Sequence, residues 1–330
     1  MKTNFPALLE SFFTVRLISQ RWASPHTIAS YRDSFRLLLQ FVHNRTKKTP
    51  SRLKLEDLDA ALIGAFLDHL EKNRQNGARS CNLRLTAIRS FFRYAAFYAL
   101  DHSAQIQQIL AIPSKRSNRK LIAFLTRPEI DALLAAPDQK TWAGRRDHAF
   151  LMLAIQTGLR LSEMIGLCRK DITLCSGAHV RCHGKGRKER CTPLTKQMVC
   201  VLKGWLHERG GGPSDAVFPN ARGNPLSPDG VQYLLAKHVE TAQRICPSLK
   251  NKRVSPHVLR HTTAMELLQA GVDRSVIALW LGHESLETTQ IYLDANLALK
   301  EEILAKTTPL NTKVGRYRAD DRLLSFLSNL

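Results

Sequence analysis

Apolar side chains that recur at alternating gaps of three and four residues constrain this chain most, because that spacing places them on one face of a helix. The first such stripe follows Ser24-Pro25, a pair typical of a helix N-terminus. Its members are Ile28, Tyr31, Phe35, Leu38 and Val42. The segment after residue 24 is therefore predicted to be a helix with one buried face.

Two more helices are predicted before residue 100. One begins near Leu55 and ends around Asn76-Gly77, where glycine suits a left-handed stop. The other begins near Ser80. The inward residues are Leu58, Leu62, Phe66 and Leu70 in the first, and Leu83 or Leu85, Ile88, Phe92 and Ala95 in the second.

The remainder of the chain indicates helices around one short sheet. Helical segments are expected at residues 126–134, 147–157, 197–208, 228–244, 256–271 and 276–281. Residues 172–194 instead alternate in the manner of strands, around a turn at residues 184–188. The predicted fold class is mainly α with a small antiparallel β-sheet.

A basic stretch without periodicity, IPSKRSNRK at residues 112–120, is typical of a linker. The predicted division is a helical domain at residues 1–111, a basic linker at 112–125, and a second domain at 126–330. A C-terminal tail is expected from about residue 293.

The charge of the chain favours a polyanionic partner. The formal net charge is +21, with 20 Lys and Arg against 8 Asp and Glu in residues 1–120 and 29 against 20 in the rest. Both halves are therefore cationic, which a basic tail on a neutral enzyme would not produce. Duplex DNA presents phosphates along both strands and fits such a field, although charge that only aids solubility would give the same count.

Neither a membrane span nor a secretory signal is expected. The sequence contains no apolar run of about 18 residues, and Glu10 and Arg16 interrupt the apolar N-terminus. Seven cysteines, an odd number with no C-x-x-C pair, favour a reducing cytoplasm over a disulfide scaffold. One cluster around a turn matches no common zinc spacing, so no metal or other cofactor is predicted: His179, Cys182, His183 and Cys191.

Six polar residues follow one another over the C-terminal two-thirds of the chain. They are Arg160 in TGLRLSE, Lys185 in HGKGRKER, His257 and Arg260 in PHVLRHT, His283 in LGHES, and Tyr292 in TTQIYLD. Two guanidiniums, an ammonium, two imidazoles and a phenol suit one task, which is to hold a phosphodiester while a phenolic oxygen attacks it. Glu163 lies three residues after Arg160 and can orient it by an ion pair.

Each segment taken alone also fits a structural role. The Arg160 and Glu163 spacing suits a surface ion pair, Lys185 suits an exposed basic hairpin, and tyrosines such as Tyr292 are usually core residues. His261, next to Arg260, fits a packing or hydrogen-bonding histidine better than a catalytic one. The order and local context of the six residues carry the functional hypothesis.

These segments resemble the motifs of the tyrosine recombinase (phage integrase) family of DNA strand-exchange enzymes. The resemblance covers nearly the whole chain, and SPHTIASYRDSFRLLLQFV resembles the start of that family's core-binding domain. It implies a two-domain clamp around DNA, with residues 1–111 as the core-binding domain and residues 126–330 as the catalytic domain.

The resemblance also implies the role of each site residue, with no cofactor or metal. Tyr292 would be the nucleophile that forms a 3′-phosphotyrosine, and Lys185 would be the acid for the departing 5′-oxygen. The transition state would be stabilised by Arg160 and Arg260. His257 would act as acid and base, and His283 would donate a hydrogen bond to phosphate.

The implied partner is double-stranded DNA, bound by a homotetramer on two sites. Without DNA the protein is expected to be weakly associated or monomeric, and accessory recombination proteins could take part. The expected location is the cytoplasm, on the nucleoid. The tail after Tyr292 could dock onto a neighbouring protomer or fold back onto its own domain.

Six basic residues of the first half are expected to face DNA phosphates, although a solvated surface would use the same residue types. Four lie on the third predicted helix and two in the linker: Arg79, Arg84, Arg89, Arg93, Lys115 and Arg116.

Three other functions remain open at this point. A type IB topoisomerase would share the chemistry and relax DNA as a monomer. A catalytically idle DNA-binding regulator would need a broken catalytic position, and none is visible. A metal-dependent nuclease would use His257, His261 and His283.

Overall fold

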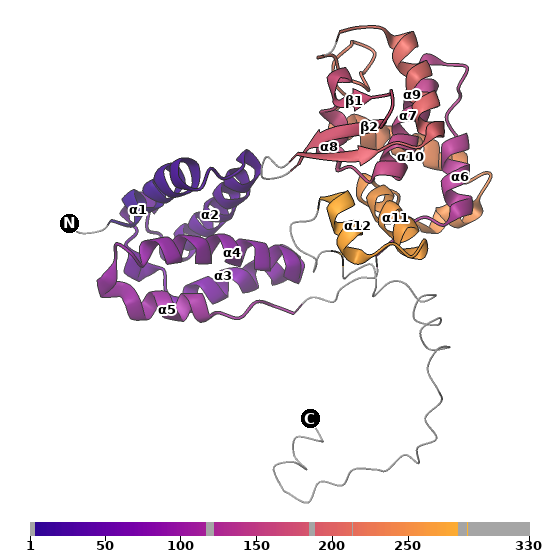
Figure 1. The fold of residues 1–330 in the computed structure, drawn as a ribbon. Coiled ribbons are helices and arrows are strands. Elements are labelled where there is room, and N and C mark those ends of the chain that lie inside the picture. Colours follow the sequence, from indigo (N-terminus) through magenta and orange to yellow (C-terminus); the bar gives the residue numbers. More distant parts are fainter. Residues whose placement is uncertain (1–3, 117–121, 185–188, 213, 283–288, 290–330) are drawn as a thin grey trace, which may run out of the picture. The chain divides into compact units, whose positions relative to one another are not determined.

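The computed structural model describes residues 4–116, 122–184, 189–212, 214–282 and 289. The chain divides into two compact units, Met1–Arg119 and Lys120–Leu330, coloured along the chain in Figure 1. Helices predominate in both units, and the sheet among the described residues is small and antiparallel. The predicted fold class is therefore confirmed. None of the described helices is long and apolar enough to cross a membrane.

The first unit is an all-helical bundle around an aromatic core. Phe12 and Phe91 are fully buried, and their rings lie edge to face with centroids 5.6 Å apart. Its helices are α1 (Phe5–Ser11), the π-helix η1 (Phe12–Gln20), α2 (Pro25–Thr46), α3 (Ala60–Lys72), α4 (Ala78–Ala95) and α5 (Ser103–Ala111). Short 3-10 turns connect them at η2 (Pro50–Arg52), η3 (Leu55–Asp57) and η4 (Leu100–His102).

The predicted N-terminus and stripe of α2 are confirmed. The Ser24 hydroxyl accepts a hydrogen bond from the Thr27 backbone N–H at 3.2 Å, which satisfies one of the free donors of the first turn. Phe35, Leu38 and Val42 are each at most 2% exposed.

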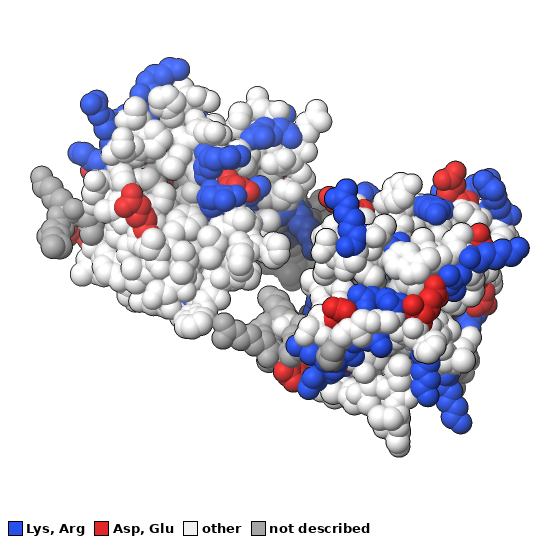
Figure 2. All heavy atoms as spheres, turned by 90° about the horizontal axis from the view of Figure 1, so that it is seen from above, with Lys and Arg blue, Asp and Glu red and all other residues white. Residues whose placement is uncertain are grey.

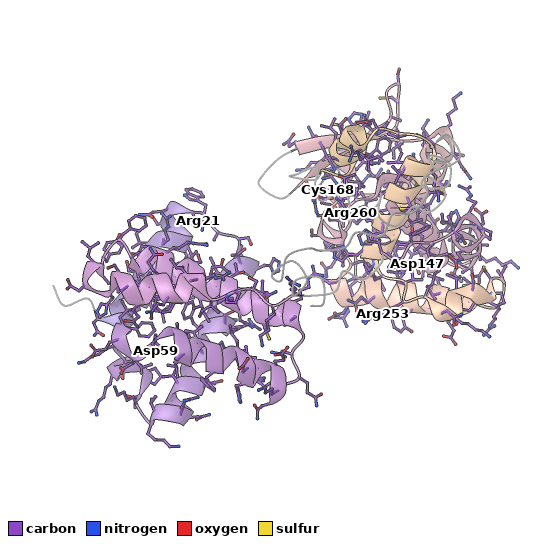
Figure 3. The ribbon with its side chains drawn as sticks, turned by 90° about the horizontal axis from the view of Figure 1, so that it is seen from below. Arg21, Asp59, Asp147, Cys168, Arg253 and Arg260 are labelled. Atoms are coloured by element: carbon purple, nitrogen blue, oxygen red, sulfur yellow. The ribbon has the colours of Figure 1, made fainter. Side chains whose placement is uncertain are left out.

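The boundaries predicted for the second helix are wrong. Leu55–Asp57 forms a single 3-10 turn, and α3 begins at Ala60 because the Asp59 carboxylate caps it, accepting from the Leu62 N–H at 2.7 Å. Figure 3 labels Asp59. The expected left-handed residue is not Gly77, which caps α4 with φ −67°, but Gln75, with φ +52°.

Both ends of the predicted linker are held by the unit next to them. At the first end, the Lys115 N–H donates to Asn82 Oδ1, and Asn82 Nδ2 donates to the Lys115 carbonyl, each at 2.8 Å. At the other end, the Leu125 N–H donates to Thr262 Oγ1 at 2.9 Å, and Lys252 Nζ donates to the Phe124 carbonyl at 2.9 Å. Lys115 is therefore held by the first unit, and Phe124 and Leu125 by the second.

The described part of the second unit combines helices with a three-stranded sheet. The strands β1 (Ile172–Thr173), β2 (His179–His183) and β3 (Glu189–Pro193) lie in sequence order, and Cys182 pairs with Arg190 across β2 and β3. The helices are α6 (Arg127–Ala135), α7 (Trp142–Thr157), α8 (Leu161–Ile165), α9 (Lys196–Arg209), α10 (Pro228–Ala242), α11 (Pro256–Gln269) and α12 (Arg274–Leu281). Two 3-10 segments complete it, η5 (Arg169–Asp171) and η7 (Pro247–Asn251).

A buried polar cluster ties α7 to α10. Asp147, labelled in Figure 3, is 3% exposed, and one carboxylate oxygen accepts from the Arg146 guanidinium at 2.7 Å. The other oxygen lies 2.8 Å from His238 Nε2 on α10. Buried charges are costly unless paired, so this cluster fixes how the two helices pack.

The helix α7 must end where it does because α11 and α12 close over Gly158, the residue that follows it. Gly158 has φ +61°, and a Cβ atom placed on it would lie 2.6 Å from Leu281 Cδ2 and 3.2 Å from the Thr263 side chain. Glycine is therefore needed at this position both for the left-handed backbone and for the space.

We expect Gly158→Ala to lower the free energy of unfolding of the second unit by roughly 1–3 kcal/mol, because it combines a left-handed alanine with overpacking. Gly204→Ala is the matched control, since Gly204 lies exposed inside α9 with nothing near its Cβ position. Alanine there should stabilise by up to about 1 kcal/mol. Denaturant unfolding followed by tryptophan fluorescence measures both, and equal effects of the two changes would contradict this account.

Candidate active site

Arg160 lies just beyond α7, at the N-cap of α8, in the turn that begins at Gly158. Glu163 accepts a hydrogen bond from the Arg160 backbone N–H at 2.8 Å, as an acidic residue at the third position of a helix often does. The same carboxylate accepts from Arg160 Nη1 at 3.0 Å. One glutamate therefore fixes both the backbone and the side chain of this arginine.

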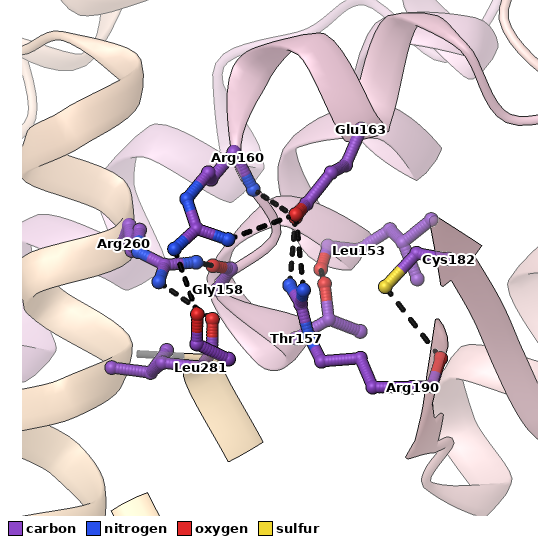
Figure 4. Close-up of polar contacts among 10 residues, drawn as sticks. Leu153, Thr157, Gly158, Arg160, Glu163, Cys182, Arg190, Arg260 and Leu281 are labelled. Carbon is purple, nitrogen blue, oxygen red and sulfur yellow. Dashed lines mark hydrogen bonds and ion pairs between the residues drawn. The ribbon is translucent and has the colours of Figure 1, made fainter. Parts of the chain in front are cut away.

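Arg260 lies in the second turn of α11 and is 5% exposed. Its Nη1 donates to the Gly158 carbonyl at 2.6 Å and its Nη2 to the Leu281 carbonyl at 2.6 Å. It therefore joins the carboxyl ends of α7 and α12 (Figure 4).

Two consecutive carbonyls at the end of α12 bring the guanidiniums together. Leu281 accepts from Arg260, and Gly282 accepts from Arg160 Nη2 at 2.8 Å. Figure 4 shows the two arginines side by side at this end of the helix. The carboxyl end of a helix carries partial negative charge, which offsets the repulsion between two neighbouring cations. The segments numbered near 160, 260 and 282 thus meet at one place.

The Glu163 carboxylate is a buried charge of this site, with its side chain 3% exposed. Burial by itself would raise the pKa of this group, but hydrogen bonds from Arg190 and Arg160 outweigh burial and hold the pKa below its ordinary value of 4.5. The four donor contacts on its two oxygens occupy about the full accepting capacity of a carboxylate. Glu163 is therefore ionised at neutral pH.

Sequence reasoning missed Arg190, which supplies two of those four contacts. Its Nη1 and Nη2 donate to Glu163 Oε1 and Oε2 at 3.0 and 2.7 Å, a two-pronged pair from strand β3. The Arg190 carbonyl accepts a weak bond from Cys182 Sγ at 3.6 Å, and burial raises the pKa of that thiol to about 11. No local pattern in KERCTPL marks Arg190, because its partner lies 27 residues away in the sequence.

The two histidines of α11 differ in their surroundings. His257 is exposed, whereas His261 is half-buried on the next turn. Burial, followed by electrostatic repulsion from His257 and Arg260, lowers the pKa of His261 from 6.5 to about 4. His261 is therefore neutral at physiological pH, which agrees with a packing and hydrogen-bonding residue.

Three of the six expected catalytic residues, Lys185, His283 and Tyr292, lie outside the described residues. The structure brings together Arg160, which Glu163 supports, and Arg260, and it leaves His257 exposed on the same helix as Arg260.

The six basic residues expected to face DNA divide into two sets in the first unit. Arg79, Arg93 and Arg116 are exposed. The other three have partners within the unit: Arg84 donates to the Ser34 hydroxyl at 3.0 Å, Arg89 to the Ser114 hydroxyl at 3.2 Å, and Lys115 to Asp68 at 3.1 Å.

Three of the six basic residues, Arg84, Arg89 and Lys115, therefore stabilise the first unit itself. Figure 2 shows Lys and Arg side chains spread over the visible face of each unit.

Comparisons with known proteins identify the family of the chain. The profile of the phage integrase family matches residues 123–298, and that of its N-terminal SAM-like domain matches residues 10–97. The integrase/recombinase y4rC of Sinorhizobium fredii is 64% identical over 323 residues, which cover 98% of this chain and 97% of that protein. Tyrosine recombinase XerC of Pelobacter propionicus is 34% identical, covering 90% and 94% of the two chains.

A solved structure shows the same fold. The XerH site-specific recombinase bound to its palindromic difH substrate, in a post-cleavage complex, superposes with a TM-score of 0.66 at 24% identity. The match covers 86% of this chain and 81% of that one. The chain belongs to the phage integrase family of tyrosine recombinases and is a site-specific DNA recombinase; the topoisomerase and regulator alternatives are not favoured.

The buried Glu163 predicts a defined pH dependence of stability. Because its folded pKa lies below the ordinary 4.5, its ionised form stabilises the fold above about pH 4.5, and this contribution is lost as pH falls through the folded pKa. The difference in free energy of unfolding between the wild type and Glu163→Gln should therefore be largest above pH 4.5 and shrink below it.

Denaturant unfolding at a series of pH values measures this difference. Glu240→Gln is the control, since Glu240 is exposed on α10 and its difference from the wild type should stay small throughout. A Glu163→Gln difference that is independent of pH would contradict the ionised, arginine-bound carboxylate.

Proposed function

We propose that this recombinase breaks and reseals DNA with Tyr292 as nucleophile, and with Arg160 and Arg260 as the pair that holds the reacting phosphate. The observation that carries the arginine assignment is their convergence on the Leu281 and Gly282 carbonyls. That point lies directly before His283 and ten residues before Tyr292. Two positive groups that meet at one point suit a phosphate that gains negative charge in its transition state.

The chemistry balances with the residues of this chain. The Tyr292 phenolic oxygen bonds to phosphorus and its proton passes to a base, for which His257 is proposed. The bond from phosphorus to the 5′-oxygen breaks, and Lys185 gives that oxygen a proton. His283 donates a hydrogen bond to the phosphate. A 5′-hydroxyl from another strand then reverses the steps, and since the phosphotyrosine keeps the energy of the broken bond, the scheme requires neither ATP nor metal.

Arg160 retains donors for a phosphate. A guanidinium carries five N–H groups, and the contacts to Glu163 and Gly282 use two of them. The Arg160 side chain is 28% exposed, compared with 3% for Glu163, so Arg160 is accessible from outside while its orienting partner is not.

We propose double-stranded DNA as the substrate and a homotetramer as the working assembly. The net charge of +21, shared between both halves of the chain, supports binding to a polyanion. Exchange between two duplexes breaks four strands, and each protomer supplies one Tyr292, so four protomers complete a reaction. Arg79, Arg93 and Arg116 are the proposed phosphate contacts of the helical domain, because each is exposed.

Tyr292→Phe should abolish covalent attachment to DNA, because the phenyl ring lacks the attacking oxygen. The cleavage site is first mapped on DNA that flanks the gene for this chain. A duplex nicked a few nucleotides beyond that site then loses its short 5′-hydroxyl fragment, so the wild type accumulates a protein–DNA adduct on a denaturing gel. The reaction is run in EDTA, in which a metal-dependent nuclease would be silent. Equal adduct in the variant removes Tyr292 from this role.

Arg160→Ala should leave DNA affinity nearly unchanged and slow adduct formation by about 10²–10³-fold, the usual cost of losing a preorganised transition-state donor. Gel shift measures affinity, and a single-turnover time course at saturating DNA measures cleavage. Arg222→Ala, which removes an exposed loop arginine, is the matched control. A cleavage defect that saturating DNA removes would show that Arg160 serves binding alone.

A further inference from the structure

We propose that Arg190 is a positioning residue for the reaction, acting through Glu163 on Arg160; this rests on the proposed role of Arg160. Arg190 enters the site from strand β3, whereas Arg160 and Glu163 come from the turn into α8. It has no place among the six residues of the proposed chemistry.

Charge compensation is the first reason. The Arg160 and Glu163 pair has no net charge, so the carboxylate cancels the positive charge that a phosphate would require. Arg190 binds both oxygens of Glu163 at 3.0 and 2.7 Å and restores a net charge of +1 to the group of three. Because the Glu163 and Arg190 side chains are 3% and 13% exposed, solvent screens this compensation little.

Competition for Arg160 is the second reason. A buried carboxylate that has lost a partner draws strongly on the remaining one. Without Arg190, Glu163 would keep Arg160 as its principal partner and hold the guanidinium back from a phosphate. With Arg190 present, both oxygens are already engaged, and Arg160 Nη1 is left with one shared oxygen.

The second acceptor of Arg160 also touches Arg190. Gly282, whose carbonyl binds Arg160 Nη2, has φ +64°, and a Cβ atom placed on it would lie 2.8 Å from Arg190 Nη1. Arg190 therefore packs against both groups that hold the Arg160 fork, the Glu163 carboxylate and the Gly282 backbone.

The test is a double-mutant cycle on the cleavage rate of the full chain, with the nicked DNA duplex at saturating concentration. Arg190→Gln should slow adduct formation by roughly 10- to 100-fold, the cost of misplacing a catalytic group, while DNA affinity stays the same. In the Arg160→Ala background the same change should cost less than about twofold, because the group on which Arg190 acts is gone. Arg181→Gln, which removes an exposed arginine from the neighbouring strand β2, should leave the rate unchanged.

Two outcomes would overturn the proposal: an unchanged rate in Arg190→Gln, or the full Arg190→Gln loss reproduced in the Arg160→Ala background. Thermal unfolding checks that each variant is folded. If Arg190→Gln is not, the cycle is run with Arg190→Lys, which keeps the charge, gives up the two-pronged contact and should lose less activity. Failure of the proposed function would look different from failure of the Arg190 proposal. In that case the wild type would form no Tyr292 adduct, or Arg160→Ala would cleave DNA normally.

Discussion

The packing of the second unit around Arg160 depends on one buried carboxylate. Glu163 is shared by the start of α8, through the Arg160 backbone and side chain, and by strand β3, through Arg190. A buried anion of this kind is costly unless it is paired and hydrogen-bonded, and the loss of either arginine leaves its oxygens with fewer donors. The sheet and the helical turn are therefore fixed relative to each other by electrostatics as well as by apolar packing.

The carboxyl end of α12 adds a second constraint. It offers two successive carbonyls, and each takes a different arginine. The residues they hold are about a hundred positions apart in the sequence, so no local rule could place them together. The order of motifs predicted that Arg160 and Arg260 serve one site, and the structure supplies the contacts by which they meet.

Local signals predicted most of the fold. Hydroxyl caps, prolines at first turns and apolar stripes marked α2, α6 and α11, because these features act within one or two helical turns. Boundaries failed where two signals competed, as at Asn76-Gly77, where glycine begins α4 instead of ending α3. Arg190 was missed because its partner, Glu163, lies in another element, so no pattern in the neighbouring sequence marks it.

Charge alone does not tell which arginines of α4 have partners inside the first unit. Arg84 and Arg89 lie on the same helix as Arg79 and Arg93, yet the first two tie their helix to neighbouring segments of the first unit. The sequence alone does not distinguish an arginine that joins two parts of its own domain from one that binds a phosphate. Exposure, which separates them, depends on tertiary packing.

The anchoring of both ends of the linker sets the reach between the two units. Lys115 is fastened to the first unit and Leu125 to the second, so ten steps of backbone span at most roughly 35 Å. Once either unit holds a duplex, so short a tether presents the other to the same stretch of DNA at an effective concentration on the order of millimolar. Two linked units would then stay at one site longer than either unit would alone.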